Sequence, residues 1–471
     1  MKKLYVPLFL YLLLSFTGVI SAQEIRLRKG AVNDSVTLQD SLSTNFAMYI
    51  PSNYNEEKKW AVIFAFDPEG RGRSTAQLFR TAAEQQGYLI AAANFNLKDD
   101  SISNIVQKAS KMVNGVLSSF PIHEDMIYAA GMEEGAQVAS TLPIFYKNIA
   151  GILAIGNSFV NPKYIDKENP YMFIGLAGTK DYMVYEMERY LKFYDEKGFK
   201  TEVDYFEGME KEWPEAAVIN NAVTGFTLQA ISNSKRENDL QFIKELFESE
   251  LEYTEILRRS RNYYDAYTKL ERMEEKYEAF GFKDTIEDRL KAIKDSDFFK
   301  NQRKDFRQAT LVEKQYQGEY EYLLETDLVT INFENIGWWA YQMDELQKLK
   351  ENSKKATSNM AFRLHGYLDY ITKNRFNSIQ NSKAPIDLKI FISVLRTVID
   401  KENPEAYFKI ISLAAGDGDY ETALLYLEDL LKTGYKNMDA LYAIDGTLDL
   451  QLTQDYNEII KKYLGESKYY N

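Results

Sequence analysis

The sequence of 471 residues contains no cysteine and only two histidines. The absence of cysteine excludes disulfide bonds, thiolate nucleophiles, cysteine-ligated zinc, iron–sulfur clusters and a lipid-modified N-terminal cysteine. Two histidines leave little material for a metal site built from imidazoles, or for several catalytic centres that each need a histidine base. From these absences we expect no metal and no cofactor.

The chain also lacks an excess of basic residues. It has 57 lysines and arginines against 70 aspartates and glutamates, which gives a formal net charge of −13. Binding nucleic acid through a broad face requires clustered cations that displace counterions, so we expect no nucleic-acid partner. Apolar residues make up 45% of the chain, enough for packed cores, and the length predicts two or three domains.

Residues 1–22 have the form of a secretory signal peptide. Lys2 and Lys3 precede an apolar run over residues 4–19, and Ala22 completes a small-residue cleavage site. The alternative is an uncleaved membrane anchor, but the small residues and the polar segment that follows favour cleavage. No later stretch approaches the ~18 apolar residues that a membrane span needs. We therefore expect a periplasmic or secreted protein without stable membrane insertion after cleavage.

Residues 23–234 alternate short apolar runs with amphipathic segments. Continuous apolar runs are typical of strands that are covered on both faces of a mostly parallel sheet. Strands that alternate with helices predict βαβ units in a doubly wound α/β sheet. We expect strands at residues 46–50, 61–66, 89–93, 126–130, 151–155, 172–177 and 201–205. We expect helices at residues 76–86, 105–119, 136–145, 185–196 and 215–231.

Residues 235–471 show almost no strand signals and predict an all-helical domain. The clearest unit is a pair of helices over residues 405–434 with a turn at 416–419, where small Ala415 and Ala423 let the helices approach closely. The pair resembles a single tetratricopeptide-type repeat; the alternative is an ordinary helical domain with one helical hairpin. Stacked helical pairs form concave protein-binding surfaces, so we expect a protein partner through this region.

A strand-to-helix turn in the first half carries a chemical motif. The apolar run that ends at Tyr128-Ala129-Ala130 leads into Gly-x-Glu-x-Gly, with Glu133 at its centre, and then into a helix with small residues. This sequence has the form of a nucleophile elbow, in which the glycines permit a tight turn and a close approach of strand and helix.

Together with this elbow, the pattern over residues 44–229 resembles the α/β-hydrolase superfamily, especially its small secreted esterase-like members. The resemblance implies an oxyanion loop at residues 67–72. It also implies a serine at the elbow, an acid after a later strand and a histidine after the last strand. The chain has Glu133 in place of the serine and Lys211 in place of the histidine, and only Asp181 matches. The resemblance therefore implies a degenerate site without an intact catalytic triad.

The remaining candidate bases and nucleophiles do not restore this chemistry. His123 precedes the elbow strand and should lie at the opposite end of the sheet, whereas His365 belongs to the helical half. Glu133 as a carboxylate nucleophile would still need a base to activate water, and a lysine is a poor base unless it is desolvated. Glu133, Asp181 and Lys211 fit an ion-paired cluster in which one ammonium lies between two carboxylates.

Acidic residues offer a second chemical option. Oxygen ligands for Ca²⁺ would have to come from the carboxylates of several loops, and their spacing matches no calcium-loop motif. The residues considered are Glu133, Glu134, Asp181, Glu210 and Glu212. The Asp-Gly-Asp turn at residues 417–419 also lacks the remaining ligands of a calcium loop and is interpreted as a turn between helices.

These patterns predict an exported, non-catalytic pseudo-hydrolase that acts as a binding or scaffold module in the cell envelope. A protein partner would use the helical half, and a small ligand could occupy the residual cleft. The alternative is an unconventional, serine-independent hydrolase of the esterase type that uses the same cleft. A third interpretation is an envelope structural protein in which both halves are spacers.

Overall fold

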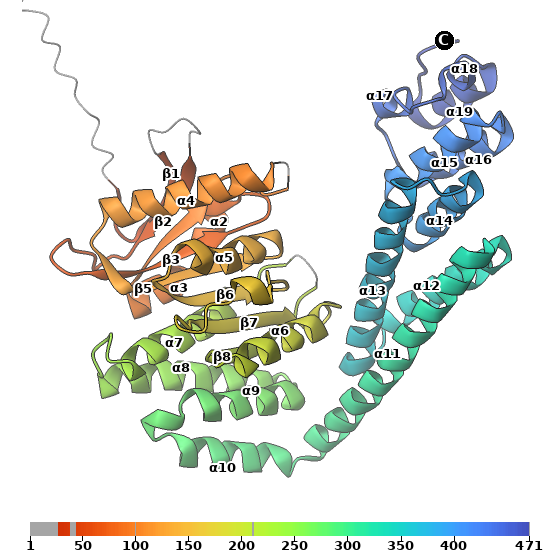
Figure 1. The fold of residues 1–471 in the computed structure, drawn as a ribbon. Helices are drawn as coiled ribbons and strands as arrows, with labels where there is room; N and C mark the ends of the chain where they lie inside the picture. Colours follow the sequence, from red (N-terminus) through yellow and green to blue (C-terminus); the bar gives the residue numbers. More distant parts are fainter. Residues whose placement is uncertain (1–26, 38–43, 99, 210–211, 471) are drawn as a thin grey trace, which may run out of the picture. The chain divides into compact units, whose positions relative to one another are not determined.

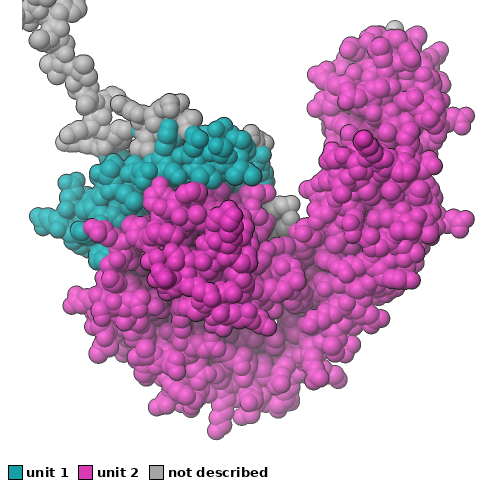
Figure 2. Space-filling view, viewed as in Figure 1, with its two compact units in different colours: residues 1–123 teal, residues 124–471 magenta. Residues whose placement is uncertain are grey.

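The computed structural model describes residues 27–37, 44–98, 100–209 and 212–470 (Figure 1). The predicted signal peptide and Lys211 lie outside the described residues, so both stay predictions. The chain divides into two compact units, Met1–His123 and Glu124–Asn471 (Figure 2). The domain boundary predicted between residues 234 and 235 falls inside the second unit and also stays a prediction.

Eight strands form one sheet in the order β1-β2-β4-β3-β5-β6-β7-β8. The pairs β1–β2 and β2–β4 are antiparallel, while β3–β4, β5–β6, β6–β7 and β7–β8 are parallel. The strands are β1 (Ala31–Thr37), β2 (Asn45–Ile50), β3 (Trp60–Phe66), β4 (Tyr88–Ala93), β5 (Ile122–Met132), β6 (Ile149–Ile155), β7 (Met172–Gly178) and β8 (Thr201–Phe206). The predicted mostly parallel, doubly wound α/β sheet is confirmed, and a helical region follows it.

Two details of the first unit differ from the sequence expectation. Strand β1 was not expected because most of its residues are polar. In the structure these residues are half-exposed, and the strand is defined by its backbone pairing with β2. The helix expected over residues 76–86 is two helices, α2 (Gly72–Leu78) and α3 (Arg80–Gln86). They are separated at Phe79, whose side chain is fully buried.

The other helices cover the sheet and build the second half of the chain. They are α4 (Ile102–Ser119), α5 (Glu134–Phe145), α6 (Val184–Glu196), α7 (Ala216–Ser232), α8 (Leu240–Arg259), α9 (Tyr263–Lys276), α10 (Lys283–Lys294), α11 (Asp297–Thr330), α12 (Ile336–Lys350), α13 (Lys355–Gln380), α14 (Ile386–Ile399), α15 (Pro404–Gly416), α16 (Tyr420–Lys432), α17 (Met438–Leu441), α18 (Leu448–Gln451) and α19 (Gln454–Leu464). Short 3₁₀ helices are η1 (Pro162–Tyr164), η2 (Glu278–Phe280) and η3 (Phe333–Asn335). Within the described ranges, no helix has both the length and the apolar character needed to cross a membrane.

Helices α15 and α16 form the helical hairpin that the sequence predicts. Ala415 and Ala423 are buried in its core. The carboxylate of Asp419 accepts a hydrogen bond from the backbone N–H of Thr422 at 3.1 Å and so caps the N-terminus of α16. The acidic turn therefore serves a helix end, as interpreted from the sequence. Its likeness to a tetratricopeptide-type repeat stays a prediction.

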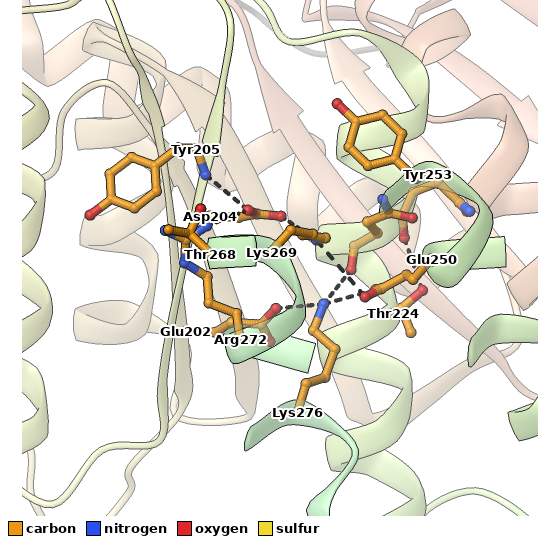
Figure 3. A network of polar contacts seen from close by, with 12 residues as sticks. Glu202, Asp204, Tyr205, Thr224, Glu250, Tyr253, Thr268, Lys269, Arg272 and Lys276 are labelled. Carbon is orange, nitrogen blue, oxygen red and sulfur yellow. Dashed lines mark hydrogen bonds and ion pairs between the residues drawn. The ribbon is translucent and has the colours of Figure 1, made fainter. Parts of the chain in front are cut away.

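Edge strand β8 carries two acids on the face that α8 and α9 cover (Figure 3). Glu202 and Asp204 are two residues apart, so their side chains share one face of the strand. Asp204 is buried, and Glu250 on α8 is fully enclosed. Two buried carboxylates and the largely buried Glu202 thus lie close together, an arrangement that is unfavourable unless cations neutralise them.

Helix α9 supplies those cations from one face, because Lys269, Arg272 and Lys276 are three and four residues apart. Lys269 pairs with Asp204, and Arg272 reaches the same carboxylate at 3.1 Å. Lys276 pairs with the two glutamates at 2.5 and 2.9 Å. Burial raises the pKa of Asp204, but Lys269 and Arg272 outweigh burial and lower that pKa to about 2. The ion pairs join the helical half to the edge of the sheet.

Replacing Lys276 with methionine is expected to lower the free energy of unfolding by about 3 kcal/mol, because Glu202 would lose its ion pair and Glu250 would keep only the longer one to Lys269 at 3.8 Å. The matched control is Lys192→Met, which removes an ion pair between exposed side chains and should cause no measurable loss. Urea denaturation followed by circular dichroism at pH 7 gives both values. Equal losses in the two variants would contradict a stabilising role for the network.

Candidate functional site

Glu133 occupies the turn between β5 and α5. Its backbone has φ 51° and ψ −118°, a conformation that side-chain-bearing residues rarely adopt and that costs of order 1–3 kcal/mol. The Glu133 N–H donates to the carbonyl oxygen of Ile155 at 3.0 Å, and the Glu133 carbonyl accepts from Ala136 and Gln137. The strained turn of a nucleophile elbow is therefore present, with a carboxylate at its tip.

Close packing of the backbone explains the first glycine of the motif. A Cβ atom on Gly131 would lie 2.1 Å from the carbonyl oxygen of Gly135, a distance that no real contact permits. Strand β5 and the first turn of α5 therefore pass each other without room for a side chain at Gly131. This is the physical reason expected from the sequence for the Gly-x-Glu-x-Gly spacing.

The structure brings two of the predicted site residues together. A Cβ atom on Gly156, just after β6, would lie 2.3 Å from Oε1 of Glu133 and 3.5 Å from Oδ2 of Asp181. Glu133 is 8% exposed and Asp181 is 2% exposed. Two buried carboxylates at such close range repel each other unless a proton or a cation lies near them. Lys211, the predicted cation, is outside the described residues.

Asp181 belongs to a tight loop after β7. Its Oδ1 accepts a hydrogen bond from the N–H of Met183 at 2.8 Å, which orients the carboxylate. The loop after β8 runs beside this loop, because the N–H of Lys180 donates to the carbonyl oxygen of Gly208 at 3.1 Å. The chain segment that leads to Lys211 therefore begins next to Asp181.

The first half of α13 lies against both loops. Buried Arg363 donates from Nη1 to the carbonyl oxygen of Thr179 at 2.5 Å. Its other nitrogens donate to the carboxylate of Glu313 on α11 at 2.8 and 2.5 Å. Lys355, the first residue of α13, pairs with Glu207 at 2.9 Å. The helical region thus contacts both loops at this edge of the sheet, which the sequence offered no signal to predict.

Tyrosine side chains line this contact. Gly366 of α13 packs on Tyr182, where a Cβ atom would lie 3.0 Å from the ring. The rings of Tyr182 and Tyr370 have centroids 5.2 Å apart. Burial raises the pKa of Tyr190 on α6, and the neighbouring Tyr370 and Glu133 raise it further.

The loop over residues 67–72 belongs to the first unit, and its backbone N–H groups donate hydrogen bonds to Asp67 at its start. Oδ1 of Asp67 accepts from the N–H groups of Glu69 and Arg71 at 2.9 and 3.3 Å. The Arg71 side chain completes a two-pronged pair with the same carboxylate, at 3.0 and 2.9 Å. The N–H of Gly70 donates to the Asp67 carbonyl. Three successive amides thus have acceptors inside the loop, whereas an oxyanion hole needs amides directed at a ligand.

Neither histidine lies at the turn. His123 is the second residue of β5, whose other end is Met132, as its place in the sequence predicts. His365 is half-buried on α13 and lines a groove with Lys350 and Asp400. Burial lowers the pKa of His365, and the Lys350 ammonium lowers it further, to about 4. His365 is therefore neutral at pH 7 and lies apart from the elbow turn in the chain's helical half.

Two buried serines of the sheet layer bond to each other. The Ser140 hydroxyl donates to the carbonyl oxygen of Ala136 at 2.6 Å, one turn earlier in α5. Its oxygen lies 2.9 Å from that of Ser158. Both hydroxyls are therefore engaged in hydrogen bonds within the fold.

No metal-binding group of three or more His, Asp or Glu side chains is found among the residues that the structure describes. Glu210, one of the residues considered as a calcium ligand, is outside them. The carboxylate of Glu212, another of that set, accepts a hydrogen bond from the N–H of Met209 at 3.0 Å. The loop therefore uses this acid for its own backbone.

No protein-family model and no curated protein matches this chain. Among solved structures it is similar to a fungal esterase from Rhizomucor miehei, with a TM-score of 0.36 and 12% identity over 43% of this chain and 84% of that one. It is also similar to an esterase from Pyrobaculum calidifontis, with a TM-score of 0.36 and 12% identity over 44% of this chain and 87% of that one. For the S-formylglutathione hydrolase of Staphylococcus aureus the TM-score is 0.33 and the identity 10%, over 43% of this chain and 98% of that one. Structural likenesses at these identities do not indicate which reaction this chain catalyses, or whether it catalyses one.

The strain at the elbow predicts an unusual order of stabilities. Glycine reaches φ 51° and ψ −118° without steric cost, so Glu133→Gly should be about 1–2 kcal/mol more stable than Glu133→Ala. Both variants lose the carboxylate, so the difference reports on the backbone alone. At Glu134, inside the first turn of α5, the order should reverse, because glycine weakens a helix. Urea denaturation measures all four variants, and the same order at both positions would refute the strain.

The lowered pKa of His365 predicts a loss of stability in mild acid. The unfolded chain binds a proton near pH 6.5 and the folded chain only near pH 4, so the contribution is complete above pH 6.5 and falls between those values. The loss should reach at most about 3 kcal/mol. Unfolding midpoints of the wild type and His365→Gln should therefore diverge between pH 7.5 and pH 4.5. Parallel pH curves would contradict the assignment.

Proposed function

We propose that this protein is a non-catalytic member of the α/β-hydrolase fold class that binds a partner protein, or a small ligand in the residual cleft, in the cell envelope. The observation that carries the proposal is the turn at Glu133. It keeps the strained backbone of a nucleophile elbow and presents a carboxylate where acyl transfer needs an activated hydroxyl. Export through residues 1–22 is part of the same proposal.

The surroundings of Glu133 support binding over turnover. Asp181 lies beside it, so the two acids compete for the same compensating charge. A carboxylate nucleophile would in addition require a base that activates water to release the ester intermediate. The proposed role for Lys211 is to neutralise the two acids, a role that a protonated ammonium performs and a general base does not.

Two further observations, one in each unit, support the same conclusion. The amides of residues 69–71 already have acceptors inside their own loop. Arg363 and Lys355 attach α13 to the two loops that follow β7 and β8. Loops that are tied to a helix in this way form a rigid surface, which favours recognition through a preformed shape.

The decisive test is hydrolysis of p-nitrophenyl acetate and butyrate by the full-length mature protein. The wild type should show the same rate as Glu133→Ala, because the carboxylate does no chemistry. Activity that disappears in Glu133→Ala would contradict the proposal and favour the serine-independent hydrolase.

A double substitution tests the assigned positions. Glu133→Ser combined with Lys211→His should create measurable ester turnover, and neither single variant should do so, since a serine needs a base and a base needs a nucleophile. Matched substitutions one residue away, Glu134→Ser with Lys211→His, serve as the control. Equal rates in the two double variants would show that residue 133 has no special place in the site.

A further inference from the structure

A groove of about 450 Å³ runs between α9 and α11, away from the elbow. Its floor is aromatic. The ring of Tyr264 on α9 stacks on Phe306 of α11 with centroids 4.3 Å apart, and Tyr267 packs on Phe299 at 4.4 Å. Because each pair joins the two helices, the floor is held in place before any ligand arrives. A preformed apolar floor lowers the entropic cost of binding.

The rim of this groove is cationic. Lys294, Arg303 and Arg307 line it together with one acid, Glu271, so the lining has a net charge of +2 in a chain of net charge −13. All three cations are exposed, and none has an ion pair with any residue of the described chain. Lys300 on the same helix, by contrast, pairs with Asp297.

We propose that this groove, the α9–α11 groove, binds an acidic peptide segment of a partner protein. Aromatic or aliphatic side chains of the segment would cover the floor, while its carboxylates pair with Lys294, Arg303 and Arg307. A concave floor between two helices, with cations above it, has the form that recognises an amphipathic acidic segment. Arginine suits the task because its planar guanidinium accepts a carboxylate through two hydrogen bonds.

A flat lipid surface or a nucleic acid fits the groove less well. The aromatic side chains of the floor are half-buried or buried and stack on each other, so they cannot insert into a bilayer as protruding side chains do. Three cations at one groove, in a strongly acidic chain, release too few counterions for binding nucleic acid. An acidic peptide with apolar side chains can cover the aromatic floor and pair with the cations of the rim at the same time.

The experiment measures the fluorescence anisotropy of labelled 12-residue peptides with the full-length mature protein at low salt. One peptide alternates Glu and Asp with Leu and Phe, and the second has Lys at every acidic position. The acidic peptide should bind with a dissociation constant below about 1 mM and weaken as salt rises, and the basic peptide should not bind. Equal binding of the two peptides, or no binding of the acidic one, would overturn the proposal.

Variants locate the site. The double variant Arg303→Glu with Arg307→Glu should lower the affinity for the acidic peptide at least about tenfold. The control, Lys192→Glu with Lys244→Glu, makes the same charge change on exposed surfaces elsewhere and should leave that affinity within about twofold. Tyr267→Ser tests the floor and should also weaken binding. Urea denaturation shows that each variant is folded. Equal affinities of the two charge-reversed proteins would overturn the proposal.

Two further probes separate the occupant classes. A sulfated glycan and vesicles of anionic phosphatidylserine are titrated under the same conditions, and preference of the groove for either over the acidic peptide would overturn the peptide assignment. This inference rests on the proposed binding role, but its test does not involve the elbow. Glu133-dependent ester hydrolysis would contradict the proposed function and leave peptide binding in the α9–α11 groove unaffected.

Discussion

The arrangement of the second unit depends on one buried set of ion pairs between β8 and the helices α8 and α9. Carboxylates on the face of an edge strand would destabilise the fold if apolar side chains covered them, because each buried charge would then lack a partner. The ammonium and guanidinium groups of α9 meet them, so the set is neutral (Figure 3).

This attachment has consequences at the candidate site. Once α8 and α9 are held against the sheet, the helices that follow continue from a defined starting point, and α13 meets the loops after β7 and β8. The contact of Arg363 with Thr179 joins residues that are 184 positions apart in the chain. The helical half is therefore more than an appended module, since it takes part in shaping the edge of the sheet where Asp181 lies.

The elbow shows that backbone geometry and catalytic identity are separate properties. The tight turn is imposed by backbone packing: Gly131 has no room for a side chain, and Gly156 leaves space that the Glu133 carboxylate fills. None of these constraints involves a serine hydroxyl. A strained turn between a strand and a helix can therefore carry a glutamate at its tip, which is the basis of the proposed non-catalytic role.

Much of the fold was predictable from local patterns, because strands such as β3 and β4 are apolar throughout and helices such as α16 carry apolar side chains at a regular spacing. The sequence by itself also determined the composition of the site: glycines at 131 and 135, a glutamate at 133 and an aspartate at 181. Strand β1 escaped prediction because its polar residues are paired through the backbone. Only the tertiary structure decided which side chains meet across long separations, such as Lys276 with Glu202 and Arg363 with Glu313. Spacing along a chain orders side chains on one helix or strand, whereas the pairing of charges from distant elements is set by how those elements pack.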